Sequence, residues 1–195
     1  MIIGVDEVGR GCLAGPVAAG AVILSQKIRG LKDSKLLTRE QRTKFDARIR
    51  QRALGFGVGW ASVEEVNALG LTEAVRLAMH RAVDEVLLAV DAVEQLIVDG
   101  NYNYFANHRL SPVSQALIKA DQLVPAVSAA SIIAKVARDL HMTGLAPQYP
   151  GFGFESHVGY ATPAHRRALR ELGATNIHRI NFRQVREAVA ASDKR

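Results

Sequence analysis

Short apolar stretches in the first sixty residues predict three neighbouring β-strands. Residues 2–5 are β-branched or glycine, and residues 17–24 are almost wholly apolar. Residues 54–60 alternate large apolar side chains with glycine. These runs are typical of buried and half-buried strands. Because the three follow one another closely, we expect an antiparallel meander, and two further short strands are predicted over 96–98 and 113–118.

The segments between and after these strands carry helix signals. Capping boxes, in which a hydroxyl residue stands three positions before Gln or Glu, begin at Thr38 and at Ser62. Ser128 is expected to cap a long helix, and Pro163 opens a later one, since proline favours the first turn. Helices are therefore predicted over 39–52, just after 62, and over 72–90, 128–145, 162–173 and 183–191.

This order of elements predicts an α/β fold in which helices cover both faces of a mixed five-stranded sheet. The chain has 195 residues, which is enough for one hydrophobic core. We expect residues 1–145 to form the main domain, which contains the sheet. Residues 146–195 are expected to pack on the same domain as a C-terminal helical extension.

Composition narrows the class of protein. The chain is 48% hydrophobic, which argues against disorder, and its net charge of +6 makes a polyanionic partner plausible without deciding for one. The many basic residues of 39–52 are read as a solvated helix face. Cys12 is the only cysteine, which excludes an intrachain disulfide. With no signal-peptide pattern and no apolar run long enough to cross a bilayer, a cytoplasmic monomer without membrane contact is expected.

Acidic residues stand at the ends of the predicted strands. Asp6 and Glu7 follow the first strand, Asp99 the fourth and Asp121 the fifth. Gathered at one sheet edge, they would repel one another unless a cation held them. Oxygen ligands without thiolates favour Mg²⁺ or Mn²⁺, and two such ions can catalyse phosphodiester hydrolysis. Singly, Asp99 could serve a turn before Gly100, and Asp121 a loop or a cap.

Gly9, Arg10 and Gly11 follow the first acidic pair directly. Two glycines allow a backbone to approach a phosphate or sugar closely, and an arginine can clamp a phosphate. The alternative is a glycine-rich turn with a surface arginine. A Walker P-loop is excluded, because no Gly-Lys-Ser/Thr follows.

Together these motifs resemble the ribonuclease HII family, and the landmarks span roughly residues 2 to 182. They are Asp6-Glu7-Val8-Gly9-Arg10-Gly11, Asp33-Ser34-Lys35-Leu36, Val98-Asp99-Gly100, Lys119-Ala120-Asp121, the run from Ser128 to Asp139, Gly159-Tyr160 and His165. The resemblance implies a ribonuclease H-like fold. The chain departs from the family pattern at Cys12, in the aromatic stretch 101–108, and at 178–182, which matches the basic terminal motif only loosely.

The resemblance also implies roles for single residues. Asp6, Glu7, Asp99 and Asp121 match the catalytic and metal-binding carboxylates, with two Mg²⁺ or Mn²⁺ ions expected. Asp139 matches a further acid near the site, although an ordinary pair with Lys135 explains it equally well. Three substrate roles are implied as well: the 9–11 loop senses the 2′-hydroxyl, Lys35 faces a phosphate, and Tyr160 stacks on the deoxyribose after the ribonucleotide. Taken alone, Tyr160 would be read as a packing residue.

The function expected is therefore a metal-dependent endonuclease that cuts the RNA strand of RNA–DNA hybrids and cuts 5′ of ribonucleotides embedded in DNA. It would leave 5′-phosphate and 3′-hydroxyl ends. Two alternatives stay open: a junction resolvase of the same fold, and a non-catalytic nucleic-acid-binding module. The histidines 157, 165 and 178 lack metal-ligand spacing, and surface or capping roles are expected for them.

Overall fold

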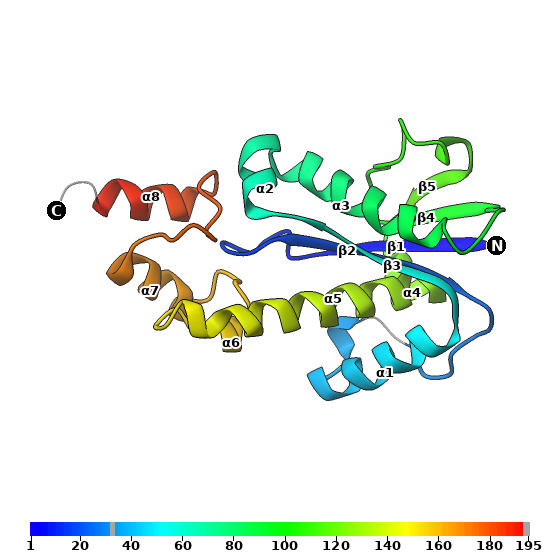
Figure 1. Cartoon of the computed structure of the whole chain (residues 1–195), viewed down its shortest axis with the longest axis horizontal. Helices are drawn as coiled ribbons and strands as arrows, with labels where there is room; N and C mark the ends of the chain where they lie inside the picture. The colour runs from blue at the N-terminus through cyan, green and yellow to red at the C-terminus, as the bar shows by residue number, and fades with distance from the viewer. Residues whose placement is uncertain (32–33, 193–195) are drawn as a thin grey trace.

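The computed structural model describes residues 1–31 and 34–192, with side chains up to residue 190. Its centre is a five-stranded sheet in the order β3-β2-β1-β4-β5 (Figure 1). Strands β1 and β2 pair antiparallel, as do β2 and β3, whereas β4 runs parallel to β1 and β5 to β4. This confirms the meander and the mixed sheet. The strands are β1 Ile2–Val8, β2 Val17–Leu24, β3 Ala53–Ala61, β4 Gln95–Asp99 and β5 Ser114–Leu117.

Helices cover both faces of the sheet, as predicted. In Figure 1, α2 and α3 lie above the sheet and α1 and α5 lie below it. Helices α6 to α8 lie together toward the end of the molecule that carries the C-terminus. The α-helices are α1 Arg39–Arg52, α2 Val63–Leu69, α3 Leu71–Val86, α4 Ala120–Leu123, α5 Pro125–Leu145, α6 Phe154–His157, α7 Pro163–Leu172 and α8 Arg183–Ser192. Short 3₁₀ turns are η1 Ser34–Leu36, η2 Ser111–Val113 and η3 Ala146–Gln148.

Glycine lets α5 lie directly on the strands that carry the acidic residues. A Cβ atom at Gly20 of β2 would stand 2.2 Å from the carbonyl oxygen of Ala130 in α5. Gly20 is the register partner of Asp6, so one close approach of α5 falls beside that acid. A larger residue at Gly20 would force the helix away from the sheet, because backbone atoms cannot yield as a side chain can.

Most helix boundaries follow their caps, but three expectations were wrong in detail. Both capping boxes are formed, at Thr38 and at Ser62. Ser128, however, does not begin α5; the helix starts at Pro125, and the Ser128 hydroxyl donates instead to the carbonyl of Asp121 at 2.6 Å. Proline in the first turn explains the earlier start. The helix predicted to end at residue 90 ends at Val86, and β1 continues to Val8.

The C-terminal helices pack against the end of the sheet through a cluster of buried aromatic and aliphatic side chains. Phe152, Phe154 and Met142 form its centre. Backbone hydrogen bonds join this part to the loop after β1, where Leu13 N–H donates to the carbonyl of Gly159 at 2.9 Å. Among the described residues, no helix is both long and apolar enough to cross a membrane.

Candidate active site

The acidic residues lie where the parallel strands end. In register, β1 and β4 pair as far as Val5 and Val98, so Asp6 and Glu7 extend past that ladder while still pairing with β2. Asp99 is the last residue of β4. The acidic pair therefore belongs to the strand itself rather than following it, and alternation along a strand points its two side chains to opposite faces.

Asp6 is buried on the side of α5. Its carboxylate accepts the Glu7 backbone N–H at 2.8 Å and a hydrogen bond from Ser131 of α5. Burial raises the pKa of Asp6 well above its ordinary value, and the nearby charge of Glu7 raises it further. The hydrogen bond from Ser131 acts in the opposite direction but does not cancel these effects.

The pKa values of the other two strand acids, Glu7 and Asp99, are raised as well. Burial raises the pKa of Glu7, and the guanidinium of Arg10 lowers it again in part. Burial also raises the pKa of Asp99, with a further contribution from the charge of Asp121. Three neighbouring carboxyl groups are thus harder to ionise in the folded chain than in water, mainly because they are buried.

Asp121 lies in α4 and is only 2% exposed. Its backbone N–H donates to an Asp99 carboxylate oxygen at 3.3 Å, so the two residues adjoin. The carboxylate of Asp121 pairs with the ammonium of Lys35 at 3.2 Å. The lysine expected to face a phosphate therefore sits at the acidic cluster, bound to one of its members. Asp33 of the same motif lies outside the described residues.

A pocket of about 260 Å³ brings the remaining predicted residues together. Its walls combine acids, basic side chains, the glycine-rich loop and one aromatic ring. They include Asp6, Glu7, Asp99, Gly9, Arg10, Gly11, Lys35 and Tyr160. Neither Asp121 nor Asp139 lines the pocket, although Asp121 pairs with the lining residue Lys35. Acidic and basic groups in one polar hollow are the arrangement needed to bind a phosphodiester beside metal ligands.

The two glycines of the loop differ in what the fold requires of them. Gly9 has φ +87°, and a Cβ there would meet the Nε of Arg138 at 2.1 Å. Gly11 has no such constraint, since nothing lies within 4 Å of an added Cβ. Gly9 is explained by folding alone, whereas the open space at Gly11 is available to a ligand that approaches the backbone.

Comparison with known proteins decides the family. The family model described as ribonuclease HII matches residues 3–185. A ribonuclease HII from Cupriavidus necator is 50% identical over 97% of this chain and 79% of its own length. The chain belongs to the ribonuclease HII family. A solved ribonuclease H2 from Pyrococcus horikoshii is 26% identical, superposes with a TM-score of 0.78, and covers 100% of this chain and 99% of its own.

A more distant solved structure shares the fold. Bst ribonuclease HIII, solved in complex with Mn²⁺, is 22% identical with a TM-score of 0.74, covering 100% of this chain and 70% of its own. The ribonuclease H-like fold predicted from the sequence is thus confirmed. The family is that of an endoribonuclease H, a hydrolase, also as expected.

Several residues of this ribonuclease HII chain contribute to the site without having been predicted. The hydroxyl of Tyr104 accepts a hydrogen bond from Arg10 Nη1 at 2.7 Å and so holds the loop arginine beside Glu7. Ser131 and Ser34 share a hydrogen bond of 2.8 Å under Asp6. The aromatic stretch 101–108 was the available signal for Tyr104. The serines gave none, because only the packing of α5 and η1 brings them to the acid.

Asp139 forms the ion pair within its own helix that the sequence offered as the alternative to a role in the site. Its carboxylate pairs with Lys135 at 2.9 Å, one turn earlier on α5. Lys135 in turn lines the pocket and lies 5.0 Å from the centre of the Tyr160 ring. Asp139 therefore reaches the pocket through a lysine rather than by direct contact.

The expectation for the three C-terminal histidines was wrong in one respect. His165 and His178 are fully buried and His157 nearly so, stacked among Phe152 and Phe154 rather than on the surface. Imidazoles can be buried when each ring nitrogen has a partner, and the ring nitrogens of all three histidines do.

The donor set suits a hard divalent cation, although the ligands are not assembled around one point. Among the residues that the structure describes, no three acidic, histidine or cysteine side chains already form a metal cage. The oxygen-only chemistry of Asp6, Glu7, Asp99 and Asp121 fits Mg²⁺ or Mn²⁺. Burial is the main cause of the raised pKa values of three of them, and the nearby cations Arg10 and Lys35 offset it only in part.

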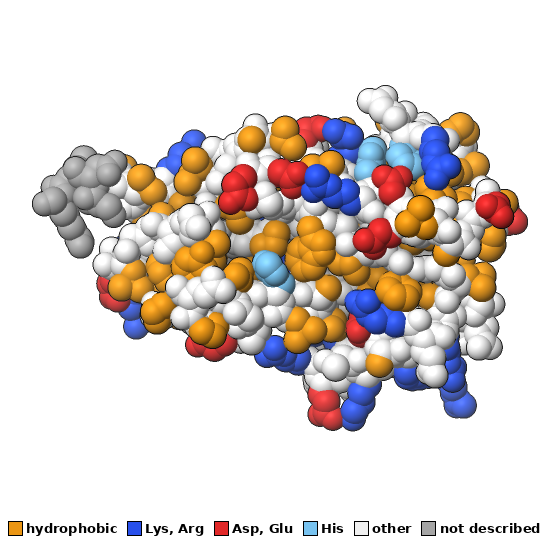
Figure 2. All heavy atoms as spheres, viewed as in Figure 1, with side chains coloured by type: hydrophobic (Ala, Val, Ile, Leu, Met, Phe, Trp, Pro, Cys, Tyr) orange, Lys and Arg blue, Asp and Glu red, His pale blue; other side chains and the backbone are white. Residues whose placement is uncertain are grey.

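Positive charge is spread unevenly over the surface. In Figure 2, Lys and Arg side chains gather toward the lower edge, where α1 lies, while acidic and basic groups alternate along the upper part. Within α1, Lys44 and Arg50 pair with acids of the same helix, as the reading of a solvated face expects. Arg42 differs, because it lines the pocket and donates to the carbonyls of Ser34 and Leu37 in and beside η1.

Proposed function

We propose that this member of the ribonuclease HII family hydrolyses the RNA strand of RNA–DNA hybrids and cuts 5′ of ribonucleotides embedded in duplex DNA. The products would carry 5′-phosphate and 3′-hydroxyl ends. The observation that carries the proposal is one polar pocket that joins strand-end carboxylates, a glycine-arginine-glycine loop and an aromatic ring. Family membership over nearly the whole chain supports the same conclusion.

Asp6, Glu7, Asp99 and Asp121 would hold the metal, with two Mg²⁺ or Mn²⁺ ions as the proposed complement. Bound ions would supply Lewis acidity and charge neutralisation at the scissile phosphate. The chain's own contribution is orientation: Ser131 fixes the Asp6 carboxylate, and Lys35 sits against Asp121. A lysine in this place can pass from the acid to a substrate phosphate once a cation compensates Asp121.

Selection of RNA is assigned to the loop and the ring. The backbone of Gly9, Arg10 and Gly11 would read the 2′-hydroxyl, which is the group that distinguishes RNA from DNA at one nucleotide. Open space at Gly11 supports this role. Tyr160 would stack on the deoxyribose that follows, and cations at Lys135 and Arg138 support one side of its ring. Phosphate contacts from the basic side chains would weaken as salt rises.

One assay separates this function from its alternatives. A DNA duplex with a single embedded ribonucleotide is incubated with the protein and Mg²⁺, Mn²⁺ or chelator, and the cut is mapped. We expect one metal-dependent cut on the 5′ side of the ribonucleotide. Cleavage of four-way DNA junctions but not of this duplex would indicate a resolvase. Equal binding with and without metal, and no cleavage, would indicate a binding module.

We also propose that the protein acts as a monomer in a reducing compartment such as the cytoplasm. The single cysteine, Cys12, is buried and supports such a compartment.

A further inference from the structure

The segment 175–179 runs behind the loop that follows β1. The backbone N–H of Arg179 donates to the carbonyl of Leu13 at 2.8 Å, and Gly15 N–H donates to the carbonyl of Ile177 at 2.8 Å. An isolated bridge also pairs Ala14 with His178. Residues far apart in sequence are therefore joined by backbone contacts immediately behind the pocket, and the two side chains at 178 and 179 point into the protein.

Arg179 supports the glycine-rich loop from inside. Its guanidinium is fully buried, donating from Nε to the carbonyl of Gly15 at 2.9 Å and from Nη1 to the carbonyl of Arg10 at 3.1 Å. No carboxylate of the described residues forms an ion pair with it, and its buried Nη2 has no hydrogen-bond partner. Burial lowers the pKa of Arg179 to about 10, so it stays charged at neutral pH. Burying a cation without an acidic partner is unfavourable, and the two carbonyls and the Phe182 ring, 5.5 Å from the guanidinium, offset that cost here.

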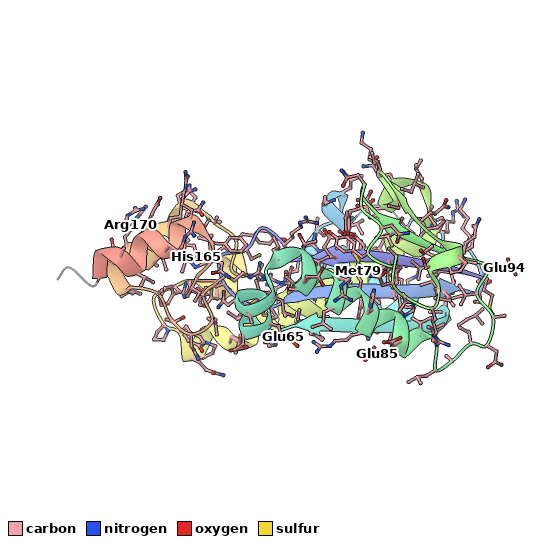
Figure 3. The ribbon with its side chains drawn as sticks, turned by 90° about the horizontal axis from the view of Figure 1, so that it is seen from above. Glu65, Met79, Glu85, Glu94, His165 and Arg170 are labelled. Carbon is pink, nitrogen blue, oxygen red and sulfur yellow. The ribbon has the colours of Figure 1, made fainter. Side chains whose placement is uncertain are left out.

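His178 supports Tyr160 through a second histidine. Thr175 N–H donates to His178 Nδ1 at 2.9 Å, which leaves the proton of that ring on Nε2. The Nε2 atoms of His178 and His165 lie 3.2 Å apart, so His165 accepts there and carries its own proton on Nδ1. That Nδ1–H donates to the carbonyl of Tyr160 at 2.9 Å. All of these contacts can form only when both rings are neutral. Figure 3 labels His165 among the C-terminal helices.

The two supported residues are those proposed to read the substrate. Arg10 and Tyr160 line one pocket, and an isolated bridge between Cys12 and Tyr160 holds the two backbone segments side by side. We infer that His165 and Arg179 are positioning residues: Arg179 sets the loop that reads the 2′-hydroxyl, and His165, whose tautomer His178 fixes, holds the Tyr160 carbonyl. They act on the substrate without touching it. This inference rests on the proposed function.

The histidine arm has a matched pair of variants. In His165→Asn the amide nitrogen takes the place of Nδ1 and can still donate to the Tyr160 carbonyl, whereas in His165→Gln the amide extends to the place of Nε2 and cannot. Both remove the ring, so both should lower the melting temperature by similar amounts. The measured quantity is the ratio of kcat/KM for the single-ribonucleotide duplex to kcat/KM for a continuous RNA–DNA hybrid, with Mg²⁺ or Mn²⁺ as the metal.

We expect His165→Asn to keep the wild-type ratio within about twofold and His165→Gln to lower it about tenfold, the scale of one lost stacking contact. In a Tyr160→Ala background, His165→Gln should change the ratio no further, because residues that act through one group are not additive. Equal ratios in the two His165 variants, or a full additional effect without Tyr160, would overturn the histidine arm.

The arginine arm has a different signature. Arg179→Lys keeps the charge but loses the two-pronged geometry that spans the Gly15 and Arg10 carbonyls. Because the loop serves both substrates, we expect kcat/KM to fall about tenfold on both, with the ratio unchanged. Wild-type rates in Arg179→Lys would overturn this arm. A wild-type protein that cuts neither substrate would instead refute the proposed function itself, so the two failures are distinguishable.

Discussion

The buried carboxyl group of Asp6 lowers the stability of the folded protein when it is ionised. Its pKa is raised by burial and by Glu7, so in the folded state the carboxyl group binds protons more readily than in the unfolded chain. Stability therefore falls as pH rises through the window between the ordinary and the raised value, and the ionised acid is unfavourable at pH 7.

Asp6→Asn should accordingly unfold at higher urea concentration than the wild type at pH 7 in chelator, while cleavage is almost abolished. The amide oxygen still accepts the Glu7 N–H, so the fold is kept. The stability gain should shrink as pH is lowered toward the ordinary aspartate pKa. Asp91→Asn, at an exposed position, is the control and should change neither property. A less stable Asp6→Asn protein with wild-type cleavage would contradict the metal-site assignment.

The lowered pKa of His178 predicts a pH dependence of stability opposite in sign to that of Asp6. Burial lowers the pKa of His178 to about 4, against an ordinary value of 6.5. The unfolded chain thus binds the extra proton between these values, and stability is complete above pH 6.5 and is lost as pH falls toward 4, by at most about 1.4 kcal/mol per pH unit.

Urea unfolding of the wild type and His178→Asn at pH 7, 6 and 5 measures this contribution. The two proteins share their carboxylates, so acid titration cancels in the comparison. We expect the wild type to be the more stable at pH 7 and the difference to narrow as pH falls. A difference that stays constant over this range would mean that His178 does not titrate in the window.

At the scale of an element, the glycine-rich loop offers a test that separates folding from function. Gly9→Ala forces a Cβ against the side chain of Arg138, which three backbone carbonyls hold in place, and requires a strained positive φ. We expect it to destabilise the protein by about 1–3 kcal/mol. Gly11→Ala meets no atom, so its stability should change by less than about 0.5 kcal/mol.

The effects of the two glycine substitutions on cleavage should differ from their effects on stability. If substrate backbone approaches the loop at Gly11, Gly11→Ala should lower kcat/KM at least about tenfold, which corresponds to 1.4 kcal/mol. Thermal unfolding and cleavage measured on the same samples decide the matter. Wild-type cleavage by Gly11→Ala would remove the loop from substrate contact at that position.

Elements governed by local chemistry were predictable from the sequence, and elements governed by tertiary contacts were not. Capping boxes at Thr38 and Ser62 placed two helix starts correctly, because side chains within one turn determine them. Ser128 misled, because its hydroxyl bonds back to the Asp121 carbonyl inside a helix that proline had already begun. Recognition of the strand-end acids required only the periodicity and the family motifs. Tyr104, Ser131 and Arg179 required the folded chain, since their partners lie 94 or more positions away or on another element.

For the whole molecule, metal and folding should be linked. A ligand that binds only the folded chain stabilises it by about 1.4 kcal/mol at ten times its dissociation constant. Millimolar Mg²⁺ or Mn²⁺ should therefore raise the melting temperature of the wild type more than that of Asp99→Asn, which removes one proposed ligand. Asp91→Asn should respond like the wild type. Equal shifts in all three proteins would place the ion elsewhere.

We further propose that residues 1–145 and 146–195 unfold together as one domain with an extension. Contacts such as Leu13 N–H to the Gly159 carbonyl, and the burial of Arg138 under the Val158 carbonyl, tie the two parts at the pocket. Calorimetry should give one transition whose calorimetric and van't Hoff enthalpies agree. Two separated transitions would show that the extension folds independently.

Helix α5 places both halves of the proposed chemistry on a single rod. Its 21 residues span about 30 Å, with Ser131 at Asp6 and Lys135 and Arg138 beside Tyr160 one and two turns later. Under the proposed function, helical pitch rather than a loop sets the spacing between the acids that would hold the metal and the ring that would stack on the nucleotide. One alanine inserted between positions 131 and 135 would rotate everything beyond it by about 100° and turn Arg138 away from the backbone carbonyls that hold it. The geometry that relates Asp6 to Tyr160 would then be lost together with the packing of the helix, although the inserted residue touches neither.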